Sequence, residues 1–359
     1  MAKLDAWGSK EILVDEKLIK EFGLSPLTEE EHLKHYLFER NLFVAHRDFG
    51  RVLECVKHRR PFIQMTGIAT SGKLHLGHKV DIDVFLMFRE LGARSFFGVC
   101  DIDAYVSRPD SKVPSMQKAK EYAIDTVAHL LALGLKPEEI YVQSRKEPRY
   151  YEFAFELSKK MTENTFRAIY GHLDLGKLSA NLLQYADMLH QQLAEYQGPM
   201  PSITCIGIDQ DPHARASRDL ARRLPYKMVL PSFLYFKHQG GLQEGNKMSS
   251  SEPDTAIFLD DTPEQIKKKI DKAFSGGRDN IEEHRKLGGV PEKDKTFEIL
   301  LFHHPDTAFV QEVYRKYKAG EMLTGELKKI VKEFLVGMLS EHQAKVAKYR
   351  KQAEKMVLG

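Results

Sequence analysis

The sequence has little of what marks a secreted or membrane-embedded protein. It contains three cysteines, Cys55, Cys100 and Cys205, and their wide scatter fits neither a disulfide framework nor a zinc site. No run of about 18 apolar residues occurs, so we expect no transmembrane helix. The first residues, Met1 to Asp5, lack the apolar region of a signal peptide. Internal repeats and low-complexity tracts are also missing. These absences predict a reduced, cytoplasmic chain with no membrane partner.

Basic and acidic residues are nearly equal in number. The net charge is +3 at pH 7, yet residues 261–359 carry 20 lysine and arginine residues against 16 acidic ones. The positive excess therefore lies in the last quarter of the chain. It is compatible with a polyanionic partner there, and equally with an ordinary basic, solvated helix face.

Apolar runs and turn residues alternate through the first 262 positions. With 359 residues and 42% hydrophobic residues, the chain is long enough for two domains, each with its own core. The runs predict strands at residues 62–65, 93–100, 140–143, 201–208 and 226–233. Helical patterns separate most of them, for example at residues 114–134, which have a proline start and a glycine stop. This alternation predicts an α/β fold with a parallel sheet covered on both faces.

The strand pattern does not return after Pro263. Helical patterns follow instead at residues 265–274, 296–302, 307–317, 326–339 and 341–356. We therefore predict three parts: an N-terminal helical appendage at 1–60, an α/β domain at 61–262 with a helical insertion at about 104–198, and an all-helical C-terminal domain at 263–359. We assign no chemistry to the first part, where packing and capping explain the pattern.

The stretch with most chemical content runs from Pro61 to His78. A short apolar strand leads into a turn of small residues, and a helical pattern begins at His75. His75 and His78 thus lie on one helix face beside free backbone N–H groups, where the helix dipole favours an oxyanion or a phosphate. Two surface histidines near a helix start are the alternative, because a lone HxxH motif is weak. Asp101, at the end of the next strand, fits either a ligand-binding edge or a helix cap.

A second motif, Lys247-Met248-Ser249-Ser250-Ser251, lies on a loop introduced by Gly240, Gly241 and Gly245. By itself it is also compatible with an ordinary polar loop. Together with His75-Leu76-Gly77-His78, in this order, it resembles the HIGH and KMSKS signatures of class I aminoacyl-tRNA synthetases. The second motif departs from the full pattern, because Ser250 stands where a second lysine is usual.

The resemblance extends over nearly the whole chain and is to tryptophanyl-tRNA synthetases of the archaeal and eukaryotic kind. It rests on residues 43–48, 207–212, 247–259, 273–279, 281–285 and 322–329 in addition to the HIGH turn. It implies a homodimer with a Rossmann catalytic domain and a helical anticodon-binding domain. Such an enzyme activates L-tryptophan with ATP and Mg²⁺ and transfers it to tRNA(Trp). ATP is then a substrate, Mg²⁺ arrives with it, and no dedicated protein metal site is expected.

The resemblance also implies site residues. Catalytic roles fall to His75, His78, Lys247, Ser249 and Ser250. ATP is expected to contact Thr70, Ser71, Gly72, His75, Gly77, His78, Gly207, Asp209, Lys247, Met248 and Ser249, with Asp209 on the ribose. The amino acid is expected to contact Met65, Gly67, Gln184, Asp187, Ile206 and Gln210, with Gln210 on its ammonium or carboxylate.

The pocket for the side chain departs from the eukaryotic pattern. Met65 and Gly98 stand where a tyrosine and a glutamine contact the indole nitrogen. The segment around Asp187 instead resembles that of bacterial tryptophanyl enzymes, in which an aspartate accepts the indole N–H. Tyrosyl enzymes pair such an aspartate with a tyrosine at the position of Met65, so Met65 with Asp187 is the tryptophan combination. The alternative for Asp187 is a solvent-facing acid on a helix.

Three other functions share parts of the pattern. A tyrosine–tRNA ligase has the same fold, both motifs and the aspartate. A HIGH-type nucleotidyltransferase without tRNA leaves the helical C-terminal domain unexplained. A catalytically inactive RNA-binding paralogue is disfavoured because His75, His78 and Lys247 are all present.

Overall fold

The structure, a computed structural model, describes residues 16–172, 174–245, 248–249 and 252–359. In these residues seven strands form one mixed sheet of order β1-β2-β7-β6-β3-β4-β5. The strands are β1 (Ser25–Pro26), β2 (Phe43–Arg47), β3 (Ile63–Ala69), β4 (Arg94–Cys100), β5 (Ile140–Val142), β6 (Ser202–Gly207) and β7 (Ser232–Phe236). The five strands from β7 to β5 run parallel to one another, which confirms the predicted α/β fold with a parallel sheet.

The first 60 residues contribute to this sheet. The segment predicted as a helical appendage contains the helices α1 (Glu16–Glu21), α2 (Tyr36–Glu39) and α3 (Gly50–Lys57), but also β1 and β2. β2 pairs antiparallel with β7, and β1 pairs antiparallel with β2. The apolar run 42–45 thus finds its partner across the sheet edge rather than on a helix face.

Helices cover the parallel strands and connect them. They are α4 (Leu76–Glu90), α5 (Asp101–Ser107), α6 (Met116–Ala132), α7 (Pro148–Ser158), α8 (Glu163–Tyr170), α9 (Leu175–Leu189) and α10 (Asp211–Arg223). α6 begins after Ser115, whose side chain accepts a hydrogen bond from the N–H of Lys118, and Gly134 follows its end with a φ of 103°. The predicted proline start and glycine stop are therefore close to the observed ends.

The last strand and the last helix differ from their predictions. β7 begins at Ser232 rather than near Tyr226, because Pro231 has no N–H to donate to a neighbouring strand. The two helices predicted at 326–339 and 341–356 form one helix of 35 residues, α15 (Thr324–Leu358). Its buried face continues through the predicted break, from Leu339 to His342, so packing holds the helix intact.

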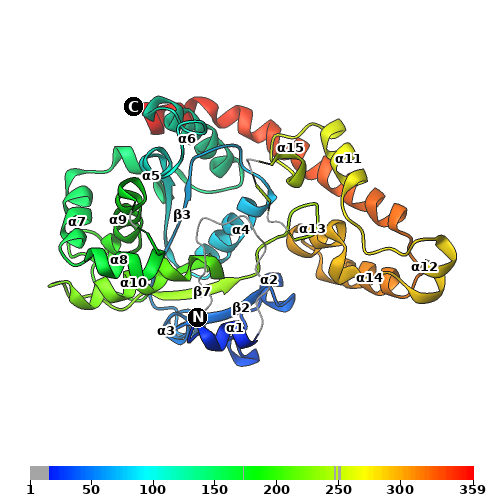
Figure 1. The fold of residues 1–359 in the computed structure, drawn as a ribbon, viewed down its shortest axis with the longest axis horizontal. Helices are drawn as coiled ribbons and strands as arrows, with labels where there is room; N and C mark the ends of the chain where they lie inside the picture. Colours follow the sequence, from blue (N-terminus) through cyan, green and yellow to red (C-terminus); the bar gives the residue numbers. More distant parts are fainter. Residues whose placement is uncertain (1–15, 173, 246–247, 250–251) are drawn as a thin grey trace.

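Beyond residue 262 the described chain contains helices and no strand. They are α11 (Pro263–Lys272), α12 (Ile281–Leu287), α13 (Lys295–His303), α14 (Thr307–Lys318) and α15. Figure 1 shows α11 to α14 on the side away from α7 to α10, with α15 running back from them to α6. Gln343 of α15 donates hydrogen bonds to the carbonyls of Leu259 and Asp261, which anchors this helix to the segment after the KMSSS loop. Among the described residues no helix is both long and apolar enough to cross a membrane.

Candidate active site

A cavity of about 600 Å³ opens at the carboxyl ends of β3 and β6. Parallel sheets place ligands at this edge, where the connections leave in different directions. Most residues predicted as site residues line it: Met65, Gly67, Ser71, Gly72, His75, Gly77, His78, Gln184, Asp187, Ile206, Gly207, Asp209, Gln210, Met248 and Ser249. Residues from six separate stretches of sequence thus meet at one cavity.

The other three predicted residues are Thr70, Lys247 and Ser250. Lys247 and Ser250 lie outside the described residues. Thr70 is 1% exposed, and its hydroxyl donates to the carbonyl of Ala119 at 3.3 Å, which ties the strand end to α6. The threonine therefore supports the turn from behind.

The HIGH turn is an N-cap built from its own histidines. The backbone N–H of His75 donates to Nδ1 of His78 at 3.3 Å, and the two rings stack with centroids 3.8 Å apart. A Cβ on Gly77 would lie 3.0 Å from the ring of His75, so glycine permits this close arrangement. His75 is buried, unlike a surface histidine.

Both imidazoles are neutral at pH 7. Burial, with the nearby His78 and Lys112, lowers the pKa of His75 well below its usual value. Burial, with Lys112 and Arg108, lowers the pKa of His78 to about 4. Nδ1 of His75 is buried and has no hydrogen-bond partner among the described residues. The turn therefore offers neutral donors and acceptors to a ligand, beside the N-terminus of α4.

The two signatures are joined through the backbone. His75 forms a β-bridge with Phe258. The N–H of Leu76 donates to the carbonyl of Ile257 at 3.0 Å, and the N–H of Leu259 donates to the carbonyl of Leu74 at 2.9 Å. The segment that follows the KMSSS loop is thus fixed against the HIGH turn. Met248 and Ser249 of the loop line the same cavity.

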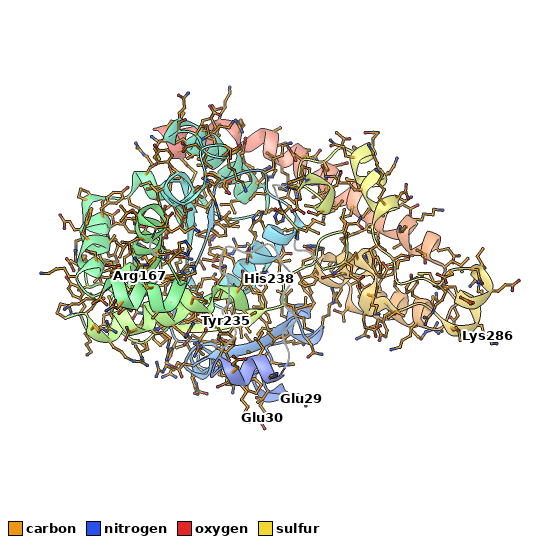
Figure 2. The ribbon with its side chains drawn as sticks, viewed as in Figure 1. Glu29, Glu30, Arg167, Tyr235, His238 and Lys286 are labelled. Atoms are coloured by element: carbon orange, nitrogen blue, oxygen red, sulfur yellow. The ribbon has the colours of Figure 1, made fainter. Side chains whose placement is uncertain are left out.

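Asp209 also lines the cavity, in the turn Ile208–Gln210 after β6. Its carboxylate is hydrogen-bonded by Nε2 of His238 and accepts from Nε2 of Gln210 at 3.0 Å. Figure 2 labels His238 near α4, in the middle of the molecule. A Cβ on Gly207 would collide with this imidazole, so the glycine makes room for it. Burial and the charge of Asp209 together raise the pKa of Asp81, also on the cavity wall, to about 7.

Asp187 is the most constrained carboxyl group of the cavity. It is 1% exposed, so the alternative of a solvent-facing acid is wrong. Oδ1 accepts hydrogen bonds from the hydroxyls of Tyr141 at 2.7 Å and Tyr150 at 2.6 Å, and Oδ2 accepts from Nε2 of Gln143 at 2.8 Å. Burial raises the pKa of Asp187 to about 6, although these three hydrogen bonds favour the charged form.

Gly98 explains how Tyr141 reaches this position. The two residues are paired neighbours on β4 and β5, and a Cβ on Gly98 would lie 2.9 Å from the Tyr141 hydroxyl oxygen. The glycine that departs from the eukaryotic pattern thus leaves room for a tyrosine from the next strand. Met65 lines the same end of the cavity and is buried.

Sequence reasoning missed several of these residues. The sequence pattern predicts only strand and helix positions for Tyr141, Gln143 and Tyr150, and no short-range pattern connects them to Asp187. Arg108 and Lys112 also line the cavity. Two cations around Pro109, just before a helix, were the available signal for them.

Comparisons with known proteins agree with this geometry. Residues 57–340 match the family model for class I tRNA synthetases (W and Y). The chain is 37% identical to the tryptophan–tRNA ligase of Aeropyrum pernix, over 99% of this chain and 98% of that protein. It is 35% identical to that of Methanocaldococcus jannaschii, over 100% and 99%. The crystal structure of the Aeropyrum pernix tryptophanyl-tRNA synthetase superposes with a TM-score of 0.88 at 36% identity, covering 95% of each chain.

Proposed function

The chain belongs to the tryptophan and tyrosine family of class I tRNA synthetases, and within it we propose that the protein is a tryptophan–tRNA ligase. The protein activates L-tryptophan with ATP to tryptophanyl-adenylate and transfers it to tRNA(Trp). One observation carries the proposal: a single cavity holds the HIGH histidines, the residues next to the loop lysine, and the buried carboxylate of Asp187.

The first step requires positioning more than proton transfer. A carboxylate oxygen of tryptophan forms a bond to the α-phosphorus of ATP, the bond to the bridging oxygen breaks, and pyrophosphate leaves with its electron pair. Because the carboxylate is already a nucleophile, no general base is needed. His75 and His78 donate to phosphate oxygens, and Lys247 with Ser249 and Ser250 closes on them from the loop.

The remaining ligand roles follow from the walls of the cavity. Ser71, Gly72 and Gly77 lie where the backbone approaches the phosphates. Asp209, oriented by His238, accepts from the ribose hydroxyls. Gln210, hydrogen-bonded to Asp209, meets the polar end of the amino acid.

Asp187 accepts a hydrogen bond from the indole N–H, and the hydroxyl of Tyr141 lies beside this carboxylate. Gly67 and Ile206 line the ring, together with Met65. Met65 offers volume and polarisability to a flat ring but no donor or acceptor for a phenol hydroxyl. This composition favours tryptophan over tyrosine, the alternative substrate of the family.

An ATP–pyrophosphate exchange assay with each of the twenty amino acids tests the assignment. We expect exchange with tryptophan and little with any other amino acid. Exchange with tyrosine in preference to tryptophan would overturn the proposal in favour of a tyrosine–tRNA ligase. Tryptophan-dependent exchange without charging of tRNA(Trp) would instead favour a nucleotidyltransferase.

The assembly around this chemistry is part of the proposal. Mg²⁺ reaches the site on the phosphates of ATP, because it favours phosphate oxygens and water. Residues 61–262 form the catalytic domain, and residues 263–359 bind the anticodon arm. Two chains form a homodimer in the cytoplasm, and the exposed Phe155 of α7, within the insertion at 104–198, suits such a contact. Sedimentation equilibrium tests the dimer.

A further inference from the structure

Two cations on the connection between α5 and α6 stand at the cavity. Arg108 and Lys112 line it together with His75 and His78. Lys73 is the third lysine or arginine on this wall among the described residues, and its Nζ is paired with Asp260 at 2.6 Å. Among the described residues, Arg108 and Lys112 therefore add positive charge to the wall at the HIGH turn.

The electrostatics place both cations close to the turn. The charge of Lys112 lowers the pKa of His75 and of His78, and that of Arg108 also lowers the pKa of His78. Since both imidazoles are neutral, they bring hydrogen bonds but no charge. Pyrophosphate gains negative charge as it leaves, so its stabilisation requires cations in addition to these hydrogen bonds.

The guanidinium of Arg108 is incompletely hydrogen-bonded. Nε of Arg108 is buried and has no hydrogen-bond partner among the described residues. Burial, and then the charge of Arg108, lowers the pKa of Lys112, so the two groups destabilise each other's charge. Asp103, on the same wall, interacts electrostatically with Arg108, and Ser107 donates to its Oδ1 at 3.0 Å. An arriving anion would satisfy the buried guanidinium and relieve the repulsion.

The loop motif supports the same conclusion. Residues 247–251 contain one lysine, Lys247, and three serines. We propose that Arg108 and Lys112 bind the β- and γ-phosphates of ATP and stabilise pyrophosphate as it leaves, supplying the charge that the loop lacks at Ser250. This assignment rests on the proposed function and adds two catalytic residues to it.

Substitution of the pair tests the assignment in tryptophan-dependent ATP–pyrophosphate exchange. Arg108→Ala and Lys112→Ala should each lower kcat at least tenfold, and the double variant should lower it more than a hundredfold, with a raised KM for ATP. The equilibrium affinity for tryptophan, measured by calorimetry, should stay within twofold. Lys112→Arg should keep most of the rate. Lys118→Ala is the matched control: this lysine starts α6, pairs with Glu121 at 2.8 Å, does not line the cavity, and should leave the rate within twofold.

The outcomes separate the two proposals. Exchange within twofold of wild type in the double variant, with active wild-type enzyme, overturns the role of Arg108 and Lys112 alone. A loss of tryptophan affinity equal to the loss of rate also overturns it, because that marks a structural role. Restoration of the rate of Lys112→Ala by a second change, Ser250→Lys, supports it. Wild-type enzyme without tryptophan-dependent exchange overturns the proposed function, and this inference with it. If Lys112→Ala does not fold, Lys112→Gln, which keeps the aliphatic stem, is judged by the same criteria.

Discussion

Replacement of Asp187 by asparagine should separate substrate recognition from folding. The carboxylate accepts from the hydroxyls of Tyr141 and Tyr150 and from the amide of Gln143. Alanine would leave the Tyr141 hydroxyl and the Gln143 amide without this acceptor, whereas the Tyr150 hydroxyl keeps the carbonyl of Leu183 at 3.3 Å. Each such group costs about 1–3 kcal/mol, and a loss of activity would then be confounded with unfolding. Asparagine keeps the shape and one oxygen for the two tyrosines.

The stability of the Asp187→Asn variant follows from two opposing terms. Burial raises the pKa of this carboxyl from 3.8 to about 6, so its ionisation destabilises the folded state by about 3 kcal/mol above pH 6. Asparagine removes that cost. It also sets an amide N–H₂ against Gln143, which loses an acceptor at a cost of about 1–3 kcal/mol. The two terms nearly cancel, so the free energy of unfolding at pH 7.5 should change little.

Tryptophan activation should fall nevertheless. Loss of one charge-assisted hydrogen bond to the indole N–H removes about 1.5–3 kcal/mol, or about 10- to 150-fold in kcat/KM for tryptophan. For the wild type, kcat/KM should rise with pH through about 6 as Asp187 ionises, and the variant should lose this rise. Pyrophosphate exchange and urea unfolding measure the two effects.

Asp101→Asn is the matched control. Asp101 is also fully buried at the end of β4 and accepts from the backbone N–H of Ile102 and of Ser144, both at 3.0 Å, but it does not line the cavity. The Asp101→Asn variant should have a lower free energy of unfolding with little change in the KM for tryptophan. Full tryptophan activity in Asp187→Asn would refute the reasoning, and so would a large loss of stability that accounts for the whole loss of rate.

Three further predictions concern the loop, the tRNA and the docking of α15. Lys247→Ala should lower kcat of the exchange reaction about 10²–10³-fold with unchanged tryptophan affinity, because the lysine acts on phosphates in the transition state; an unchanged kcat contradicts this. Charge reversal of the exposed Lys286 and Lys329 should weaken tRNA charging and its salt dependence while leaving exchange normal, with the exposed Lys159→Glu at the end of α7 as control; equal tRNA affinity for variant and control counts against it. Nδ1 of His129 and Nε2 of His342 lie 2.7 Å apart between α6 and α15, and burial lowers the pKa of His342 to about 4. Because this folded-state pKa is below the ordinary 6.5, the contribution of His342 to stability is full above pH 6.5 and is lost as the pH falls towards 4. Urea unfolding should therefore show a smaller loss of unfolding free energy at acid pH for His342→Gln than for the exposed His58→Gln.

Charge reversal at Lys328 would not test tRNA binding, although the sequence places it beside Lys329. Its Nζ donates to the carbonyls of Asp271 and Ala273 at 2.8 and 2.9 Å, which ties α15 to the end of α11. Lys286, in contrast, lies at the tip formed by α12, far from the sheet (Figure 2). The location of exposed charge on a helical domain is a tertiary property, and lysine counts alone do not reveal it.

Sequence patterns predict a structural feature correctly where neighbouring residues alone determine it. The strand-to-helix turn at His75 is a switch of apolar period within one stretch, and the structure shows it as predicted, with His75 as N-cap. The carboxylate environment of Asp187 could not be found in this way. Its donors come from β5, the turn after it and α7, and only the pairing of Gly98 with Tyr141 brings one of them into place. Gly98, where the eukaryotic pattern has a glutamine, leaves room for the Tyr141 hydroxyl beside Asp187.

The link between the two signatures limits how the loop acts. Ile257 and Leu259 are hydrogen-bonded to the HIGH turn, and Gln343 of α15 holds the carbonyls of Leu259 and Asp261 at 3.1 and 3.0 Å. The segment after the loop is thus fixed on one side by the catalytic turn and on the other by the C-terminal helix. Movement of residues 257–259 would therefore break hydrogen bonds of the HIGH turn itself. The same contacts give the helical domain a direct physical connection to His75, through two side-chain hydrogen bonds and one short β-bridge.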